Sequence, residues 1–312
     1  MRFAMIAFPL LLALLLAAGS PAAAEAVFPP GASIGLVPPP GMRPATRFAG
    51  FEDPERAASI TVNEFPAAAF DTVAGGLTPE ALGQRGLRDA RREDVRVGGR
   101  DAVLITAASD AGPVLILVAG SQDATAIVTA RPGAGAAQGA VEALRAALLG
   151  AAFRAPASLA EQLAALPFRL PVLAGFAPER TLGGNAVLLR PAGALGDPRS
   201  QPLLSIAASV GAAPEPGALE AFARRAAASI PGLGPLRIRR AGLVRFGDAA
   251  WFDIEGDAAW TDAVPPGPLL VRQAIRLTPA GYVRAVLIAP AAEAGPHGEN
   301  FARVLAALEP RP

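Results

Sequence analysis

The stretch EDVRVGGRDAVLITAASDAGPVLILVAGSQDATAIVTA, residues 93–130, decides the fold class of this chain. It contains four short runs rich in apolar and β-branched residues, a composition that is typical of strands. The runs cover residues 93–97, 102–108, 113–119 and 124–130. Short connections, including Gly98-Gly99, separate each run from the next, and connections this short join antiparallel neighbours. The stretch therefore predicts a four-stranded antiparallel meander.

Working outward from the meander, the flanking sequence predicts helices and further strands. Strands are expected at residues 34–36, 47–51 and 58–65, and helices at residues 67–87 and 136–149. Thr78-Pro79-Glu80 is typical of a helix start, because threonine caps, proline suits the first turn and glutamate favours the helix dipole. Val141, Leu144 and Leu148 fall on one face of the closing helix, which is expected to pack on the sheet.

The second half of the chain repeats this order of elements. Strands are expected near residues 168–172, 186–190, 203–210, 237–246, 249–256, 269–277 and 282–288, with helices at 217–229 and 298–308. A period of about 150 residues indicates domain duplication and not a solenoid. We therefore expect an α+β protein with a first domain at 27–155, a linker containing a short helix at 156–166, and a second domain at 167–312.

The N-terminus has the three parts of an export signal. Met1-Arg2 is basic, residues 3–18 are almost entirely apolar, and two A-x-A cleavage patterns follow, before Glu25 and before Val27. The apolar run is shorter than the ~20 residues needed to span a bilayer. We expect residues 1–24 to be a signal peptide and the mature protein, with no transmembrane segment, to be periplasmic or secreted.

Composition excludes several classes of function. The 312 residues contain no cysteine, which rules out disulfides, thiolate nucleophiles and cysteine-ligated metals. The single histidine, His297, is expected in an exposed loop before the last helix, and one histidine cannot build a multi-histidine metal site. A formal net charge of +1 predicts no nucleic-acid partner. No metal site and no cofactor is expected.

The best candidate for a binding surface lies in the second half. Asp253 and Glu255 are one residue apart on a predicted strand, so both point to one face together with Trp251. Arg272 and Arg276 share one face of the next strand, and the four charged residues are expected to form a cross-strand ladder. The same face is the predicted contact surface, and its members are Trp251, Asp253, Glu255, Trp260, Arg272 and Arg276, with the two tryptophans as aromatic anchors.

Two stretches resemble the PsbP/Mog1-like family. One is IGLVPPPGM at residues 34–42 followed by RFAGFED at 47–53, and the other is the meander with its closing helix, residues 93–149. The likeness covers residues 34–153. Residues 167–310 match the family by the order of their elements alone, and we expect them to be a second, tandem copy of the first unit. The resemblance implies an antiparallel sheet with helices packed on its faces, in an exported bacterial member of the family. It also implies a non-catalytic role, since plant relatives serve photosystem II and Mog1 binds the GTPase Ran.

Three functions are compatible with these observations. The leading hypothesis is a non-catalytic binding or assembly module of the bacterial cell envelope, with an envelope protein or a small ligand as its partner. A carboxylate-dependent hydrolase using Asp253 and Glu255 is the enzymatic alternative. A lipid- or membrane-contacting envelope module is the third, suggested by the apolar composition (52% hydrophobic residues).

Overall fold

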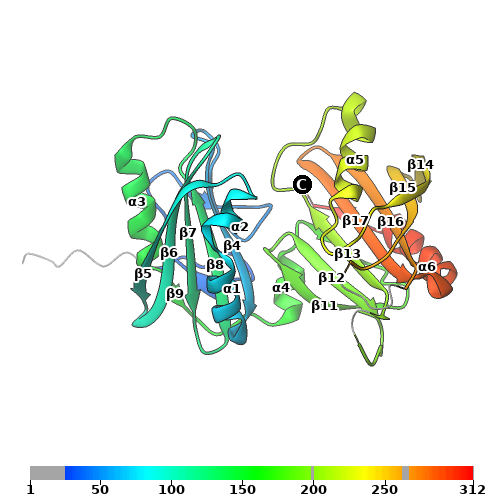
Figure 1. Ribbon diagram of the computed structural model, residues 1–312, viewed down its shortest axis with the longest axis horizontal. Coiled ribbons are helices and arrows are strands. Elements are labelled where there is room, and N and C mark those ends of the chain that lie inside the picture. The colour runs from blue at the N-terminus through cyan, green and yellow to red at the C-terminus, as the bar shows by residue number, and fades with distance from the viewer. Residues whose placement is uncertain (1–24, 198–199, 262–266, 312) are drawn as a thin grey trace, which may run out of the picture.

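The computed structural model describes residues 25–197, 200–261 and 267–311, and these form two units that lie side by side (Figure 1). Each unit contains one seven-stranded sheet in which neighbouring strands run antiparallel, with helices on its faces. The predicted α+β class is therefore confirmed. The predicted signal peptide, residues 1–24, lies outside the described residues.

The first sheet is built from residues 43–131. Its strands are β2 (Arg43–Pro44), β3 (Gly50–Asp53), β4 (Ala58–Pro66), β5 (Arg88–Val97), β6 (Arg100–Ser109), β7 (Gly112–Gly120) and β8 (Ala124–Arg131). They pair in the order β2-β3-β4-β8-β7-β6-β5. The predicted meander is present as β5 to β8. Strand β7, which lies between β8 and β6, is buried on both faces, which explains its unbroken apolar run.

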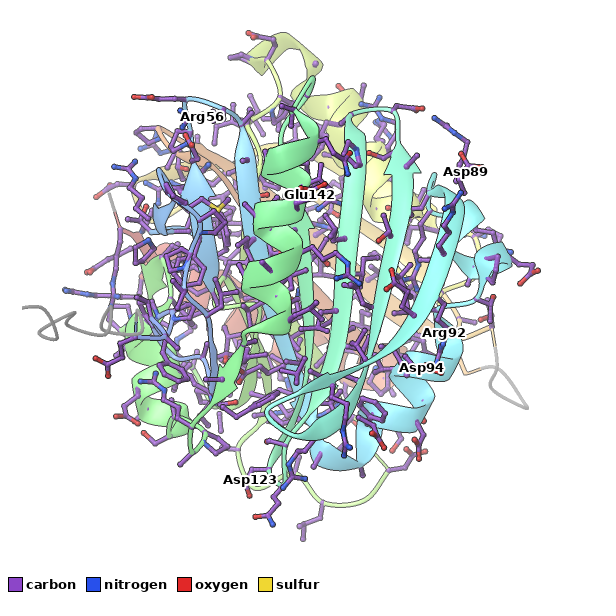
Figure 2. The ribbon with its side chains drawn as sticks, turned by 90° about the vertical axis from the view of Figure 1, so that its left-hand side faces the viewer. Arg56, Asp89, Arg92, Asp94, Asp123 and Glu142 are labelled. Carbon is purple, nitrogen blue, oxygen red and sulfur yellow. The ribbon has the colours of Figure 1, made fainter. Side chains whose placement is uncertain are left out.

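Helices cover both faces of this sheet. α3 (Gln138–Leu149) lies across one face, where Leu144 and Leu148 are buried, and Glu142 is on its exposed side (Figure 2). The opposite face carries the 3-10 turn η1 (Ala67–Ala69), α1 (Phe70–Gly76) and α2 (Pro79–Gly83). The predicted cap is observed, since the Thr78 hydroxyl accepts a hydrogen bond from the Ala81 amide at 3.2 Å.

The second sheet repeats the first in topology. Its strands are β11 (Phe176–Leu182), β12 (Ala186–Pro191), β13 (Leu203–Ala208), β14 (Arg237–Phe246), β15 (Ala249–Ala258), β16 (Leu269–Thr278) and β17 (Gly281–Pro290). They pair in the order β11-β12-β13-β17-β16-β15-β14, which matches the first sheet strand for strand. The 3-10 turn η3 (Pro216–Ala218) and α5 (Leu219–Ala228) lie on one face, and η4 (Ala291–Glu293) and α6 (Ala294–Ala306) on the other.

Each unit also has a small sheet, and a helix joins the two units. β1 (Ile34–Gly35) pairs with β9 (Ala152–Phe153), and β10 (Phe168–Arg169) pairs with β18 (Glu309–Pro310). The connecting segment contains α4 (Leu159–Ala165), as predicted for residues 156–166. Ser158 and Glu161 form a capping box at its start, which satisfies amide groups that the first helical turn leaves free.

Three strand predictions need correction. The strand expected at residues 47–51 is observed as β3, which begins only at Gly50; the Ala49 carbonyl still accepts from Val62 of β4, but the Ala49 amide donates to Gly183 of the second unit. β2 and β11 were not predicted at all. Both are edge strands that contain proline and charged residues, and a strand with one free edge tolerates proline and needs no alternating apolar pattern.

His297 is also placed differently from the prediction. It lies within the first turn of α6 and not in a loop before it, and its side chain is 18% exposed. Its ring contacts Phe176 with 5.8 Å between ring centroids, and Nε2 lies 3.6 Å from a carboxylate oxygen of Glu293. The helix begins earlier than expected because Gly295 and Pro296 fall in its first turn, where proline costs no hydrogen bond.

The turn after β3 predicts a measurable effect of pH. Arg56 Nη1 donates to Asp53 Oδ2 at 2.6 Å, and this hydrogen bond lowers the pKa of the Asp53 carboxyl below 3.8. A carboxyl whose folded pKa is below its unfolded value stabilises the fold above that unfolded value, and loses the effect as pH falls through the folded pKa. We expect Arg56→Ala to raise the pKa of Asp53 toward 3.8, measured by NMR titration. Arg43→Ala, which removes an exposed pair with Glu52 instead, is the control and should leave Asp53 unchanged.

Among the residues that the structure describes, no helix combines the length and the apolar character needed to cross a membrane.

Candidate functional site

The two units meet where the β11–β12 hairpin turn rests on the first unit. The turn residues Gly183 and Gly184 have φ of +57° and +66°, the pair of left-handed conformations of a type I′ turn. The Ala49 amide donates to the Gly183 carbonyl oxygen at 2.8 Å. A second contact joins Arg47 Nη1 to the Ala280 carbonyl oxygen at 2.5 Å. One backbone–backbone hydrogen bond and one side-chain–backbone hydrogen bond therefore join the two units at this seam.

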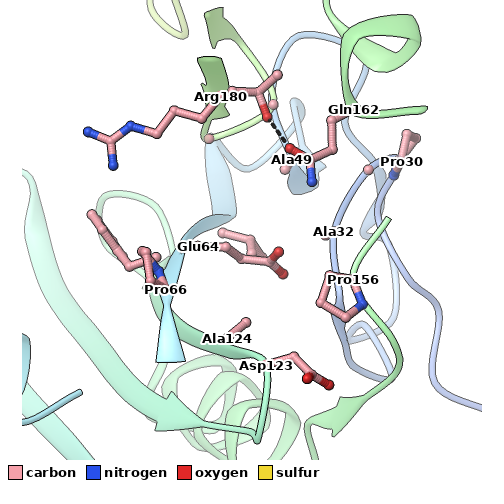
Figure 3. Close-up of a pocket in the computed structure, with 16 residues that line it drawn as sticks. Pro30, Ala32, Ala49, Glu64, Pro66, Asp123, Ala124, Pro156, Gln162 and Arg180 are labelled. Carbon is pink, nitrogen blue, oxygen red and sulfur yellow. Dashed lines mark hydrogen bonds between the residues drawn. The ribbon is translucent and has the colours of Figure 1, made fainter. Parts of the chain in front are cut away.

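A cavity of about 220 Å³ lies at this seam, and both units line it (Figure 3). The first unit supplies β4 and the β7–β8 turn, the second supplies β11 and its turn, and α4 closes one side. The polar side chains in the lining belong to Glu64, Asp123, Gln162, Arg180 and Thr181. Small and apolar residues, including Ala32, Ala49, Val62 and Pro156, form most of the rest. Clefts between domains are common positions for ligand sites.

Glu64 is the polar residue that the fold positions most firmly. Its Oε1 accepts hydrogen bonds from the Ser33 amide at 2.6 Å, the Ser33 hydroxyl at 3.0 Å and the Ile34 amide at 3.0 Å. Ser33 is fully buried, and Ile34 begins β1, so the donors are part of the rigid fold. Within the described part of the chain, Glu64 forms no ion pair, and its carboxylate is directed into the cavity (Figure 3).

The remaining polar groups come from three separate segments. Thr181 Oγ1 donates to Gln162 Oε1 at 2.7 Å, which links the second unit to α4 (Figure 3). Asp123 lies on the β7–β8 turn and is exposed. The guanidinium of Arg180 extends away from Glu64 (Figure 3). The site therefore combines the fixed carboxylate of Glu64, the exposed carboxylate of Asp123 and the amide of Gln162. The guanidinium of Arg180 points away from them (Figure 3).

None of these lining residues is among the site residues predicted from the sequence. One signal was present: in the strand ASITVNEF, Glu64 follows Ile60 and Val62 at steps of two, so it belongs to the row that faces the core. A carboxylate at an inward position needs hydrogen-bond partners or a counter-charge, and this marks it as unusual. The other lining residues come from turns and from a different unit, and their meeting depends on how the units dock.

The predicted surface on β15 and β16 is present in part as a charge cluster. Trp251, Asp253 and Arg272 lie on the face covered by α6, as the alternation predicted. Arg272 Nε lies 3.0 Å from Asp253 Oδ1 and Nη2 lies 3.2 Å from Oδ2. Asp253 is fully buried and also pairs with Arg240 at 3.0 Å, while Glu255 pairs with Arg240 at 3.1 Å. This is a mutually compensated network whose central carboxylate has no contact with solvent.

The cluster borders an open groove of about 440 Å³ beside α6. Arg239, Glu255 and Arg272 line the groove, and each is already paired with a charged neighbour. Arg272 also stacks over the rings of Phe246 and Phe301, at 5.2 and 5.1 Å from their centroids. These contacts favour a structural role for Asp253 over acid–base chemistry.

The remaining predicted residues do not join this cluster. Trp251 is 0% exposed and contacts Phe246 inside the core. Trp260 packs with Leu233, Leu269 and Val286 on the opposite face of the sheet, so the two tryptophans do not share a surface. Arg276 makes no ion pair with any residue that the structure describes. A binding role for the six residues stays a prediction, and the structure brings together only Asp253, Glu255 and Arg272.

Comparisons with known proteins give weak likenesses. The chain matches no protein-family model and no curated protein sequence. Similar solved structures include LpqN, involved in cell envelope biogenesis of Mycobacterium tuberculosis, with 13% identity and a TM-score of 0.34 over 46% of this chain and 83% of that one. The immunity protein TplEi of the type VI secretion system of Pseudomonas aeruginosa, complexed with a peptide, has 14% identity and a TM-score of 0.29 over 87% and 98%. At these values the function has to be argued from the site itself.

Proposed function

We propose that the chain is a non-catalytic binding protein of the bacterial cell envelope, which holds a ligand in the cavity between its two units. It would be an exported member of the PsbP/Mog1-like family with two tandem units. Export is supported by the sequence of residues 1–24, and the tandem arrangement by the shared strand order of the two sheets.

One observation carries the binding role. The cavity at the seam is lined by both units and contains Glu64, a carboxylate fixed by three hydrogen bonds and without a cationic partner among the described residues. Glu64 is partly buried, and partial withdrawal of a charge from water costs free energy that its hydrogen bonds from Ser33 and Ile34 offset only in part. A ligand that completes the interaction offsets this cost, which is the energetic pattern of a binding site.

A capture experiment tests the binding role. The chain is expressed with its own N-terminus and purified from the periplasm, which also tests export, with cleavage expected before Glu25 or Val27. Wild type and Gln162→Trp, whose larger side chain fills the cavity, are then incubated with a periplasmic extract, and retained small molecules are compared by mass spectrometry. We expect a species that wild type retains and Gln162→Trp does not. Equal retention by both proteins, or none by either, would contradict the proposal.

A further inference from the structure

We propose that the ligand of the seam cavity carries a small organic cation, an ammonium or guanidinium group on a short alkyl chain, and that Glu64 binds this cation. The inference rests on the proposed function, because it assigns the chemical class of the ligand at the same site. It follows from three features of the cavity: the free carboxylate oxygen, the missing counter-charge and the apolar walls.

Glu64 presents a preorganised acceptor. All three of its hydrogen bonds from Ser33 and Ile34 end on Oε1, and Oε2 has no partner among the described residues. Two of the three donors are backbone amides, which are fixed by the chain and not by a flexible side chain. Because the carboxylate is already oriented, binding a donor at Oε2 requires little loss of side-chain entropy.

Glu64 is partly buried and has no counter-charge among the described residues, whereas the two buried carboxylates there, Asp53 and Asp253, each pair with an arginine. Asp53 lies 2.6 Å from the guanidinium of Arg56, and Asp253 lies 3.0 Å from that of Arg272. Glu64 has no such partner within the described residues, and Asp123 adds a second unpaired carboxylate to the same lining. Arg180 lines the cavity too, but its guanidinium points away from Glu64 (Figure 3). The local charge at the carboxylates is therefore negative and favours a cation.

The size and walls of the cavity define the rest of the ligand. The cavity volume of about 220 Å³ is below the range of about 300–1,000 Å³ that is typical of pockets for drug-sized ligands, which favours a small ligand. Alanine, proline, valine and phenylalanine side chains make up much of the lining. Burying a short alkyl chain against them adds favourable apolar contact beside the ion pair.

Isothermal titration calorimetry with a matched series of probes tests the assignment. Butylamine, butylguanidine, butanol and butyrate share one alkyl chain and differ in the charge of the head group. We expect the two cations to bind, butanol to bind at least about 30-fold more weakly, and butyrate not to bind, since an unpaired charge in such a site costs this much. Added salt should weaken cation binding. Equal binding of butanol or tighter binding of butyrate would overturn the inference.

Variants identify the residue that binds the cation. Glu64→Gln keeps the shape and removes the charge, and it should weaken butylamine binding at least about 30-fold. Asp123→Asn, on an exposed turn, should weaken it by no more than about fivefold. Glu142→Gln is the matched control on the exposed side of α3 and should change nothing. Binding by Glu64→Gln within twofold of wild type would refute the role of Glu64.

The two proposals can fail separately. If Glu64→Gln does not fold, the probe series on wild type still decides the charge of the ligand. If Gln162→Trp abolishes retention of a species that proves to be neutral or anionic, the binding function stands and the cation assignment is wrong. If nothing is retained and no probe binds, both proposals are wrong.

Discussion

Replacing Asp253 with alanine is expected to lower the free energy of unfolding of the second unit by about 3–5 kcal/mol. The carboxylate is 0% exposed and pairs with Arg272, whose side chain is only 12% exposed. Removing one partner of a buried ion pair leaves the other charge desolvated and uncompensated. Arg240 also loses a contact, but it is half exposed and can turn to water. The large effect therefore comes from the isolated guanidinium of Arg272.

Tryptophan fluorescence during chemical denaturation measures this effect selectively. The chain has two tryptophans, Trp251 and Trp260, and both lie in the second unit, so their emission reports the unfolding of that unit. Circular dichroism follows both units and shows whether they unfold together. Glu220→Ala is the control in the same unit, because Glu220 is 57% exposed and pairs with Arg224 on the surface of α5, so it should cost less than about 1 kcal/mol.

A double variant separates the lost charge from lost packing. Asp253→Ala with Arg272→Met removes both charges and keeps an apolar chain over the rings of Phe246 and Phe301, so it should recover most of the stability. The explanation fails if the single variant loses less than about 1 kcal/mol, or if the double variant is no more stable than the single one.

Replacing Gly184 with alanine is expected to open the seam between the units. Its φ of +66° is strained for any residue with a Cβ, at roughly 1–2 kcal/mol. An added Cβ would also lie 2.6 Å from the backbone nitrogen of Ala49, a backbone atom that cannot move aside without breaking its bond to Gly183. Overpacking of this kind costs about 1–3 kcal/mol more. The hairpin turn therefore has to leave its place on the first unit.

Hydrogen exchange at the Ala49 amide reads out this contact directly. The amide donates to the Gly183 carbonyl oxygen, so opening of the seam should raise its exchange rate by about tenfold or more in Gly184→Ala. Gly99→Ala is the matched control, because Gly99 is the second glycine of another two-glycine hairpin turn, between β5 and β6, with φ of +80° and nothing within 4 Å of its added Cβ. The Gly99→Ala variant should lose stability through the strained φ, but the exchange rate of the Ala49 amide should stay unchanged. Equal exchange in both variants would refute the role of Gly184.

Features that depend on neighbouring residues could be predicted, and features that depend on distant residues could not. The meander, the Thr78 cap and the apolar face of α3 depend on residues close in sequence, and they were predicted. β11 was missed because it contains Pro178, Glu179 and Arg180, which an edge strand tolerates and a central strand does not. Trp260 was assigned to the wrong face because the chain leaves the sheet before it.

The site predicted on β15 and β16 and the candidate site at the seam differ because the first follows from local alternation and the second from long-range contacts. Asp253, Glu255 and Arg272 were brought together correctly by strand alternation, which is a local rule, yet burial makes them a structural network. The burial of Asp253 and Arg272 is due to α6, which covers this face of the sheet and is distant in sequence from β15. The seam cavity depends on contacts between residues more than a hundred positions apart, such as Ala49 with Gly183.

Alternation, turn residues and helix caps act over a few neighbouring residues, and for this reason the α+β class, the strands of both meanders and the repeated order of elements follow from the amino-acid sequence alone. The position of Glu64 in a cavity without a counter-charge, and the burial of Asp253 against Arg272, follow from the packing of the folded chain. Burial and charge compensation depend on the space around a side chain, and segments far away along the chain fill that space.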